Sequence, residues 1–446
     1  MTAETTHYDA IVVGTGPGGA TVARELARAS QRVLVFEWGG RETVTGGLGQ
    51  TFRELFMPGR SLLMTYGGMA LVRGITVGGS SLYYCGTAFE PPFEMLQRHG
   101  IDLRDEIAEA RGELPIAPLA PELLAPGVTR IMESARSLGL DWRPLSKFIY
   151  QDRCHSTRPL GFYCAPSYEA KWNARMWVDE ARENGAILRT GVKVRKVLVE
   201  GSAARGVVFT HAGRSHEVRA DKVVIAAGGI GSPVILRASG LRRAGRDFFY
   251  DPLIVVVGEV DGLDVGPELP MSAGVHCVDD GYMMTDLSVP RYFYRAMAVQ
   301  TGKLRKLGAY RRSLHIMVKA KDALGGHRTD RGGVRKGLTA TDKAKLWHGY
   351  ERARSILANA GATGIFKSGY VAAHPGGTVK VGDLLDENLR TEIENLYVCD
   401  CSVIPEAWGL PPTLTLIGLG KRLARHLLGA AGRSESSDAV QAAALG

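Results

Sequence analysis

The sequence lacks the features that mark secreted, membrane-spanning and disulfide-stabilised proteins. Only six of its 446 residues are cysteines and none forms a C-x-x-C pair, which argues against a disulfide framework and a zinc site of that type. No window approaches the roughly 18 consecutive apolar residues that a membrane helix needs. The N-terminus shows no basic region followed by an apolar core, so no secretory signal is visible. We therefore expect a cytoplasmic protein.

Signatures of nucleic-acid binding are also missing, although the formal net charge is +9. Positive charge by itself favours acidic partners or an anionic membrane surface. It is concentrated in the segment 291–312, which mixes aromatic residues with lysines and arginines. One interpretation is a solvated basic face, and the other is a peripheral contact with lipid or with an acidic electron carrier. We expect no nucleic-acid partner.

A glycine-rich turn near the N-terminus lies between two apolar runs. Residues 8–13 predict a buried strand, 20–30 predict a helix, and a second apolar run ends in the acid Glu37. This context predicts a dinucleotide site, because glycines allow a pyrophosphate to approach a helix N-terminus. Glu37 can bind ribose hydroxyls and would repel the 2′-phosphate of NADP. The glycines of this turn are Gly14, Gly16 and Gly19.

A strand, an acid and a helix near the C-terminus predict the other end of the same site. Residues 396–398 predict a short buried strand, and Asp400 follows where it ends, within reach of a sugar-like hydroxyl. Pro411 and Pro412 fix the first turn of a helix that begins near Thr413 with outward N–H groups. Such a helix start suits an electron-rich ring edge. The two ends of the chain are therefore expected to hold one long dinucleotide.

A second glycine-containing turn offers further donors. Gly78, Gly79 and Ser81 provide backbone N–H groups and a hydroxyl for a phosphate or a polar ring, although the same sequence also suits an ordinary turn. The preceding region is rich in methionine. It predicts either a lid over an apolar pocket or a surface segment packed on the core.

Alternating β-type runs at 253–260, 282–289 and 313–319 predict an antiparallel sheet. The buried run at 221–229 instead returns to the first sheet, so that sheet is built from distant pieces. The predicted fold class is α/β, with a mostly parallel Rossmann-like domain that is discontinuous in sequence. An α+β substrate domain with an antiparallel sheet is expected beside it.

Four segments, in order along nearly the whole chain, resemble the glucose-methanol-choline (GMC) family of FAD-dependent oxidoreductases: 14–37, 73–91, 228–241 and 374–423. The pattern is most similar to the cholesterol-oxidase-like and pyranose-oxidase-like members. Four independent motifs would have to coincide by chance, so the resemblance is specific. The implied parts are an FAD-binding domain (7–95, 170–245 and 385–432), a helical connecting segment (96–169), a substrate-binding domain (246–384) and a disordered tail (433–446).

The resemblance implies that FAD is the tightly bound cofactor. Its implied contacts are the glycines of the first turn for the pyrophosphate, Glu37 for the ribose, Val194 for the adenine, Gly78, Gly79 and Ser81 for the isoalloxazine, Asp400 for the ribityl or pyrophosphate portion, and Pro412 with Thr413 for the flavin N1/O2 edge. Some relatives bind FAD covalently through a histidine, but this chain has Leu82-Tyr83-Tyr84 there. The FAD is therefore expected to be non-covalent.

His374 is the implied catalytic residue. Members of the family transfer a hydride from a substrate C–H to flavin N5 while a histidine in this segment accepts the hydroxyl proton. An alcohol needs such a base, because its O–H proton hardly dissociates near neutral pH, and a neutral imidazole suits the task. Considered only structurally, His-Pro before two glycines also suits the start of a turn. No metal is expected.

Pro411 departs from the family pattern. The family usually carries Asn or His here, and proline has neither a side-chain donor nor a backbone N–H. Losing a hydrogen bond to a developing alkoxide typically costs on the order of 2.7–4 kcal/mol of transition-state stabilisation. The role must be absent or replaced, and Tyr370 and Trp408 are the candidates for a replacement.

Three functions are compatible with this sequence. The first is hydride transfer between a CH–OH group and flavin, on a hydrophobic alcohol because the 55–72 stretch is apolar and Met-rich. The second is reduction or formation of C=C or C=O bonds, for which the usual His/Asn pair is unnecessary. The third is flavin binding without catalysis. An enzyme of the first kind also needs an electron acceptor, which is oxygen, a quinone or a redox protein.

Overall fold

The computed structural model describes residues 7–43, 48–154, 170–266, 268–329 and 333–444. The end of the predicted connecting segment, 155–169, and the last two residues of the predicted tail lie outside these ranges. None of the helices within them is long and apolar enough to cross a membrane.

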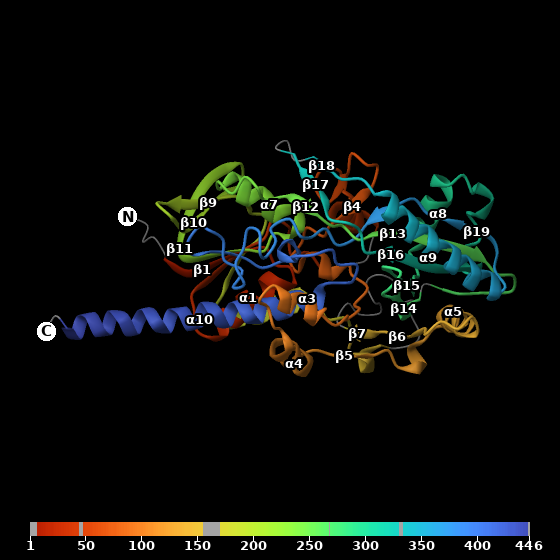
Figure 1. The fold of residues 1–446 in the computed structure, drawn as a ribbon, viewed down its shortest axis with the longest axis horizontal. Coiled ribbons are helices and arrows are strands. Elements are labelled where there is room, and N and C mark those ends of the chain that lie inside the picture. Colours follow the sequence, from red (N-terminus) through yellow and green to blue (C-terminus); the bar gives the residue numbers. More distant parts are fainter. Residues whose placement is uncertain (1–6, 44–47, 155–169, 267, 330–332, 445–446) are drawn as a thin grey trace.

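A mostly parallel sheet forms one half of the molecule (Figure 1). Its order is β8-β2-β1-β11-β10-β9, with β21 paired to β11. Pairs among β8, β2, β1, β11 and β21 are parallel, whereas β9, β10 and β11 form antiparallel hairpins. The strands are β1 (Tyr8–Val13), β2 (Val33–Phe36), β8 (Ile187–Arg189), β9 (Lys193–Glu200), β10 (Ala203–His211), β11 (Arg214–Ile225) and β21 (Leu396–Val398).

The central strands of the first sheet are apolar throughout because helices cover both faces of the sheet. Every residue of β2 and β21 is buried, as expected for parallel strands covered on both faces. In Figure 1, α7 lies above the sheet while α1 and α10 lie below it. Helix α1 packs against both α6 and α10, and α4 packs against α10. The bounds are α1 (Pro17–Arg28), α4 (Arg104–Glu113), α6 (Ala174–Glu183), α7 (Gly228–Ala238) and α10 (Thr413–Ala444).

The second sheet has nine strands in the order β3-β4-β20-β13-β16-β15-β14-β6, with β19 paired to β13. The predicted antiparallel core is confirmed in β13, β16, β15 and β14. The strands are β3 (Leu62–Met64), β4 (Ala70–Val72), β6 (Arg143–Pro144), β13 (Pro252–Glu259), β14 (Ala273–Cys277), β15 (Tyr282–Asp286), β16 (Ser313–Ala320), β19 (Thr363–Lys367) and β20 (Val371–Ala372). Three of them, β3, β4 and β6, come from outside the range 246–384, and each is too short for a periodic pattern to reveal it.

The remaining elements connect and cover the two sheets. Helix α9 packs against β13, β15 and β16, and α5 packs against α9. A capping box at Thr339 starts α9, because its side chain accepts from the N–H of Asp342 while the Asp342 side chain accepts from the N–H of Thr339. The bounds are α2 (Leu48–Thr51), η1 (Phe52–Phe56), η2 (Gly79–Leu82), α3 (Phe93–Arg98), β5 (Ile116–Pro118), η3 (Pro121–Leu123), α5 (Pro126–Ser137), β7 (Ser146–Phe148), η4 (Gln151–Arg153), β12 (Arg246–Phe248), α8 (Arg291–Gln300), η6 (Leu304–Lys306), η7 (Tyr310–Arg312), β17 (Gly325–Arg328), β18 (Val334–Arg335), α9 (Ala340–Asn359) and η8 (Cys401–Val403).

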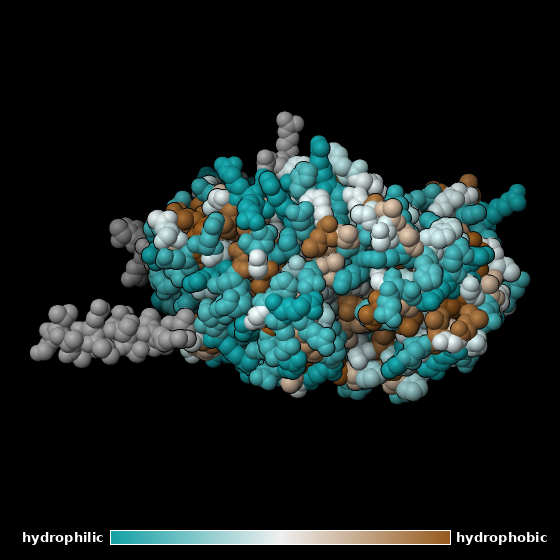
Figure 2. Space-filling model, in the orientation of Figure 1, coloured by the Kyte–Doolittle hydropathy of each residue, from teal (hydrophilic) through white to brown (hydrophobic). Residues whose placement is uncertain are grey.

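Helix α10 is the last element of the described chain. The backbone of α10 continues as a helix to Ala444, and its last turns project beyond the first sheet (Figure 1). On the face of the molecule shown in Figure 2, hydrophilic residues predominate and apolar residues form several separate groups.

Candidate active site

The first glycine turn joins β1 to α1, and its glycines have two different uses. Gly14 has φ +108°, and a Cβ there would lie 2.1 Å from the carbonyl oxygen of Ala226. A Cβ on Gly19 would lie 2.3 Å from the oxygen of Gly14. Gly16 caps α1 with an ordinary φ of −65°, and a Cβ there would meet nothing within 4 Å. The fold therefore needs Gly14 and Gly19, whereas Gly16 faces the open space in which a pyrophosphate would approach the helix start.

Glu37 ties this turn to the end of β2. Its Oε2 accepts hydrogen bonds from the N–H and the hydroxyl of Thr15, at 3.2 and 2.6 Å, and its Oε1 accepts from the N–H of Gly39 at 2.7 Å. Burial raises the pKa of this carboxyl, while these bonds oppose the shift. The Glu37 carbonyl accepts from the N–H of Val192 at 3.0 Å, which brings the residues just before β9 beside Glu37.

The Gly-Gly-Ser-Ser turn packs directly on the first turn. The N–H of Gly78 donates to the Thr15 hydroxyl at 3.0 Å, and a Cβ on Gly79 would lie 3.2 Å from Cα of Gly16. The Ser81 hydroxyl donates to the carbonyl of Gly78 at 2.6 Å and accepts from the N–H of Ala174 at 2.9 Å. Its side chain thus holds the turn against α6.

Asp400 joins the end of β21 to the start of α7. Its Oδ2 accepts from the N–H of Gly228 at 2.9 Å and from the Ser232 hydroxyl, and its Oδ1 accepts from the N–H of Ser402 at 2.7 Å. Burial raises the pKa of this carboxyl as well. The side chain therefore holds two elements that border the glycine turns.

The start of α10 presents donors that the helix cannot satisfy. The first hydrogen bond of this turn runs from the N–H of Leu416 to the carbonyl of Pro412, at 2.9 Å, so the N–H of Thr413 has no partner within the helix. The Thr415 hydroxyl and the Trp408 Nε1 are buried and have no hydrogen-bond partner among the described residues. Together with the open space at Gly16, these donors fit a large polar ligand such as a dinucleotide.

His374 follows β20 in a segment packed between α7 and η8. The N–H of Gly377 donates to the carbonyl of Cys401 at 3.0 Å, and the Thr378 hydroxyl donates to the carbonyl of Gly229 at 2.8 Å. A Cβ on Gly229 would lie only 1.9 Å from the carbonyl oxygen of Pro375. These contacts fix the backbone of His374, while 31% of its side chain stays exposed.

Two buried ionisable residues contact the ring of His374. Its Nδ1 lies 3.3 Å from Oδ2 of Asp251 and 3.3 Å from Nζ of Lys319, and those two atoms lie 3.5 Å apart. The side chains of Asp251 and Lys319 are 0% and 1% exposed. The N–H of Gly409 donates to the other Asp251 oxygen at 2.8 Å, which ties the loop before α10 to this cluster.

Sequence reasoning missed both of these residues. Lys319 stands at the end of an apolar strand and Asp251 stands between aromatic residues and Pro252, so a charge inside a buried run was the available signal. Burial lowers the pKa of His374, and nearby Lys319 lowers it further, whereas Asp251 opposes the shift. A largely neutral imidazole follows.

The two candidates for the missing family partner lie differently. Tyr370 is 36% exposed and packs against Lys367, with the ammonium 5.2 Å from the ring centroid. Trp408 is buried next to Gly409. Within the described part of the chain, neither makes a hydrogen bond with His374.

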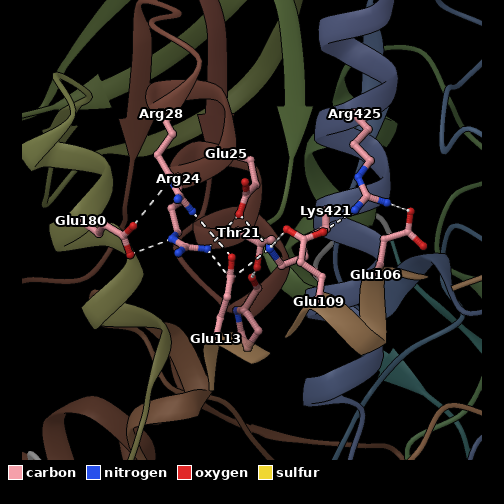
Figure 3. A network of polar contacts seen from close by, with 11 residues as sticks. Thr21, Arg24, Glu25, Arg28, Glu106, Glu109, Glu113, Glu180, Lys421 and Arg425 are labelled. Carbon is pink, nitrogen blue, oxygen red and sulfur yellow. Dashed lines mark hydrogen bonds and ion pairs between the residues drawn. The ribbon is translucent and has the colours of Figure 1, made fainter. Parts of the chain in front are cut away.

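The carboxylates of Glu25, Glu109 and Glu113 lie close enough together to hold a metal ion. The Lys421 ammonium already lies among them, at 3.1, 2.7 and 3.0 Å (Figure 3). Arg24 contacts Glu113 and Glu180 nearby, each at 2.7 Å. This network therefore joins α1, α4, α6 and α10 rather than forming a metal centre.

Comparison with known sequences points to one family. Residues 8–259 and 335–420 match the N- and C-terminal family models described as GMC oxidoreductase. An uncharacterised protein of Methanocaldococcus jannaschii is 26% identical over 94% of this chain and 100% of its own length. A long-chain-alcohol oxidase of Arabidopsis thaliana is 25% identical over 92% of this chain, which spans 65% of that enzyme. An uncharacterised GMC-type oxidoreductase of Mycobacterium tuberculosis is 30% identical over 57% of this chain and 43% of its own length.

Solved structures show the same fold. Pyridoxine 4-oxidase from Mesorbium loti superposes with a TM-score of 0.71 at 19% identity, over 94% of this chain and 99% of that one. A formate oxidase variant from Aspergillus oryzae gives a TM-score of 0.72 at 14% identity, over 96% and 99%. The predicted combination of a Rossmann-like domain with an antiparallel second sheet is thereby confirmed.

Proposed function

Because the chain belongs to the GMC oxidoreductase family of FAD-dependent enzymes, we propose that it oxidises the CH–OH group of an alcohol with His374 as the base. The observation that carries this proposal is the contact between Asp251 and Nδ1 of His374. When Nδ1–H donates to that carboxylate, the lone pair lies on Nε2, which is the other edge of the ring. An imidazole held in this way accepts a hydroxyl proton.

The chain's own residues prepare this base. The N–H of Gly409 and the buried position of Asp251 fix the carboxylate, and the carboxylate then stabilises the imidazolium that forms when His374 takes the proton. Burial keeps the resting imidazole neutral, so its lone pair is available. When bound, FAD supplies the acceptor for the hydride of the same C–H group.

FAD would be held by the residues predicted for it, and without a covalent bond. Gly14, Gly16 and Gly19 with the start of α1 suit the pyrophosphate, Glu37 suits the ribose, and the backbone of Val194 suits the adenine. The other proposed contacts are the backbone of Gly78, Gly79 and Ser81, the Asp400 region, and the start of α10 at Pro412 and Thr413.

No histidine occupies the Leu82-Tyr83-Tyr84 stretch, and the Tyr84 hydroxyl donates to the carbonyl of Trp172 at 2.7 Å. Acid precipitation should therefore release all the flavin into the supernatant, and yellow pelleted protein would contradict this.

A hydrophobic alcohol is the proposed substrate class. Phe52, Met64 and Tyr66 expose 50%, 60% and 71% of their surface in the region of the predicted lid. One relative is named a long-chain-alcohol oxidase, which agrees with an apolar substrate. The acceptor that takes the electrons from reduced flavin is oxygen, a quinone or a redox protein.

A peripheral membrane contact through 291–312 is also proposed. Ion pairs with acids of the same domain engage Lys306, Arg311 and Arg312, but Arg291, Arg295, Lys303 and Arg305 are exposed. Val299 and Leu304 are exposed beside them. Binding to anionic but not to neutral vesicles would support this contact, and equal binding to both would contradict it.

Anaerobic mixing of the holoenzyme with a panel of alcohols tests the main proposal. Flavin bleaching by an alcohol is expected, and His374→Ala should slow it by at least about a hundredfold. His348→Ala, which removes an exposed histidine of α9, is the matched control and should leave the rate unchanged. An unchanged rate in His374→Ala would remove this residue from the mechanism.

The same measurement separates the other two functions. Pro411 leaves the usual second polar group missing, which favours chemistry on C=C or C=O bonds as the alternative. Reduced enzyme that an enone or ketone reoxidises, while alcohols leave the oxidised flavin unchanged, would indicate that alternative. A flavin spectrum that no substrate changes would indicate binding without catalysis.

A further inference from the structure

We propose that Lys319 is a positioning residue that decides which nitrogen of His374 carries the proton, and therefore when His374 is able to act as a base. The inference rests on the proposed function for its catalytic meaning. The claim that Lys319 selects between the two neutral forms of the His374 imidazole rests on the geometry alone.

The three polar atoms of the cluster form a triangle. Nδ1 of His374, Oδ2 of Asp251 and Nζ of Lys319 lie 3.3, 3.3 and 3.5 Å apart. Oδ2 is an acceptor for either neighbour, whereas Nδ1 is a donor in one neutral form of histidine and an acceptor in the other. The protonation of Lys319 therefore selects the form of His374.

A charged Lys319 has no lone pair, so it can only donate. It donates to Oδ2 and to the lone pair of Nδ1, and the ring proton then lies on Nε2. In that form Nε2 is a donor and cannot accept the proton of an alcohol. A neutral Lys319 removes the repulsion between its ammonium and Nδ1–H, so Nδ1–H donates to Asp251 and the lone pair moves to Nε2.

The surroundings allow Lys319 to change its charge. Its side chain is 1% exposed on β16, and burial lowers its pKa while Asp251 opposes the shift. The Asp251 carboxylate also accepts a hydrogen bond from the N–H of Gly409, so Lys319 is not the only donor that its negative charge serves. The other titratable groups that face this cluster are Cys85, His276, Asp322, Lys336 and Cys401. Asp322 is itself paired with Lys336 at 2.9 Å, so no further carboxylate is free to hold Lys319 charged.

The form of His374 is measured directly by NMR of holoenzyme labelled with ¹⁵N-histidine, with His374→Gln used to assign the signal. In the pH range where the ring holds a single proton, wild-type His374 should carry it on Nε2 at the lower end and on Nδ1 at the upper end. Over that range Lys319→Met should hold the proton on Nδ1, and Lys319→Arg, which stays charged, should hold it on Nε2. One form in wild type at every pH, shared with both variants, would overturn the proposal, and the wild-type titration needs no variant to fold.

The rate of anaerobic flavin reduction measures how the charge of Lys319 affects catalysis by His374. Below the ionisation of Lys319 the wild-type rate should fall about tenfold per pH unit, because one proton blocks the base. Lys319→Met should lose this ionisation and keep only the limb due to His374, whereas Lys319→Arg should stay slow throughout. Equal losses in both variants with an unchanged pH profile would mean a merely structural role and would overturn the proposal. If NMR shows the ring proton moving from Nε2 to Nδ1 while His374→Ala reduces its flavin at the normal rate, the proposed function is wrong. The inference that Lys319 selects the form of His374 would still hold.

Discussion

Asp251 occupies a backbone conformation that its place in the chain disfavours. Its φ is +48°, and Pro252 follows it directly. The N–H of Asp251 donates to Asp322 at 2.9 Å, which holds this conformation in place. Strain of this kind persists where the surroundings determine it and is typical of functional sites.

Asp251→Asn should therefore slow flavin reduction without unfolding the protein. Asparagine tolerates a positive φ, but it no longer carries the charge that stabilises an imidazolium. We expect a loss on the order of a hundredfold in the anaerobic reduction rate. Asp247→Asn is the matched control, because this aspartate also has φ +48° but its side chain is exposed, whereas that of Asp251 is buried against His374. Equal effects of the two substitutions would contradict a role for Asp251.

Asp286 predicts an unusual dependence of stability on pH. The residue is 2% exposed, its Oδ2 has no partner among the described residues, and burial raises its pKa to about 7. Between about pH 4 and pH 7 the folded state binds more protons here than the unfolded state, so this residue makes the protein less stable as pH rises. Asp286→Asn should raise the free energy of unfolding at pH 8 by on the order of 2–4 kcal/mol and by much less at pH 4.

Urea unfolding at the two pH values checks this prediction, with the exposed Asp261→Asn as the control. A gain for Asp286→Asn that is the same at pH 4 and pH 8 would contradict it, because the effect would then not come from ionisation.

At the scale of elements, the loop between β1 and α1 contains one glycine that the fold does not need, Gly16, and one that it does, Gly19. Gly16→Ala adds a methyl group to open space at an ordinary φ, so the apoprotein should keep its stability while FAD binding weakens. Gly19→Ala should destabilise the apoprotein itself, by about 2 kcal/mol or more, because its Cβ would overlap the oxygen of Gly14. FAD fluorescence quenching and thermal unfolding of the apoproteins measure the two effects. Unweakened FAD binding by Gly16→Ala would place the pyrophosphate elsewhere.

Elements with a strong local signal were predictable from the sequence. The continuous apolar run of β1 and the glycine turn that follows it each depend on neighbouring residues. Strands β3 and β6 were not predictable, because two or three residues carry no periodicity and take their conformation from their partners. The Asp251–Lys319 contact was missed for a related reason: it joins β16 to the start of β13, and one sequence contains no signal for that proximity.

At the scale of the whole molecule, Lys421 holds four helices together. Its side chain is 1% exposed and lies among three carboxylates. Lys421→Met should lower the free energy of unfolding by about 1.5–3 kcal/mol, because three partly exposed carboxylates lose their charged hydrogen bonds to a buried ammonium. Arg425 contacts Glu106 and Glu109 from a side chain that is 51% exposed, so Arg425→Met should cost at most about 1 kcal/mol. Equal losses in guanidinium unfolding would contradict the difference.

Strand β11 pairs with different strands in its two halves. Its first half forms a hairpin with β10, and its second half pairs with β1 and, through Val223–Ile225, with β21. The start of α1 also packs on the C-terminal region, since Gly18 approaches the carbonyl of Cys399 too closely to carry a side chain. A nascent chain on the ribosome can thus make the hairpin early, but the surroundings of the glycine turn are complete only after residues 396–399 have emerged. The glycine turn at the start of α1 therefore reaches its final surroundings only after the strands of the second sheet have been synthesised.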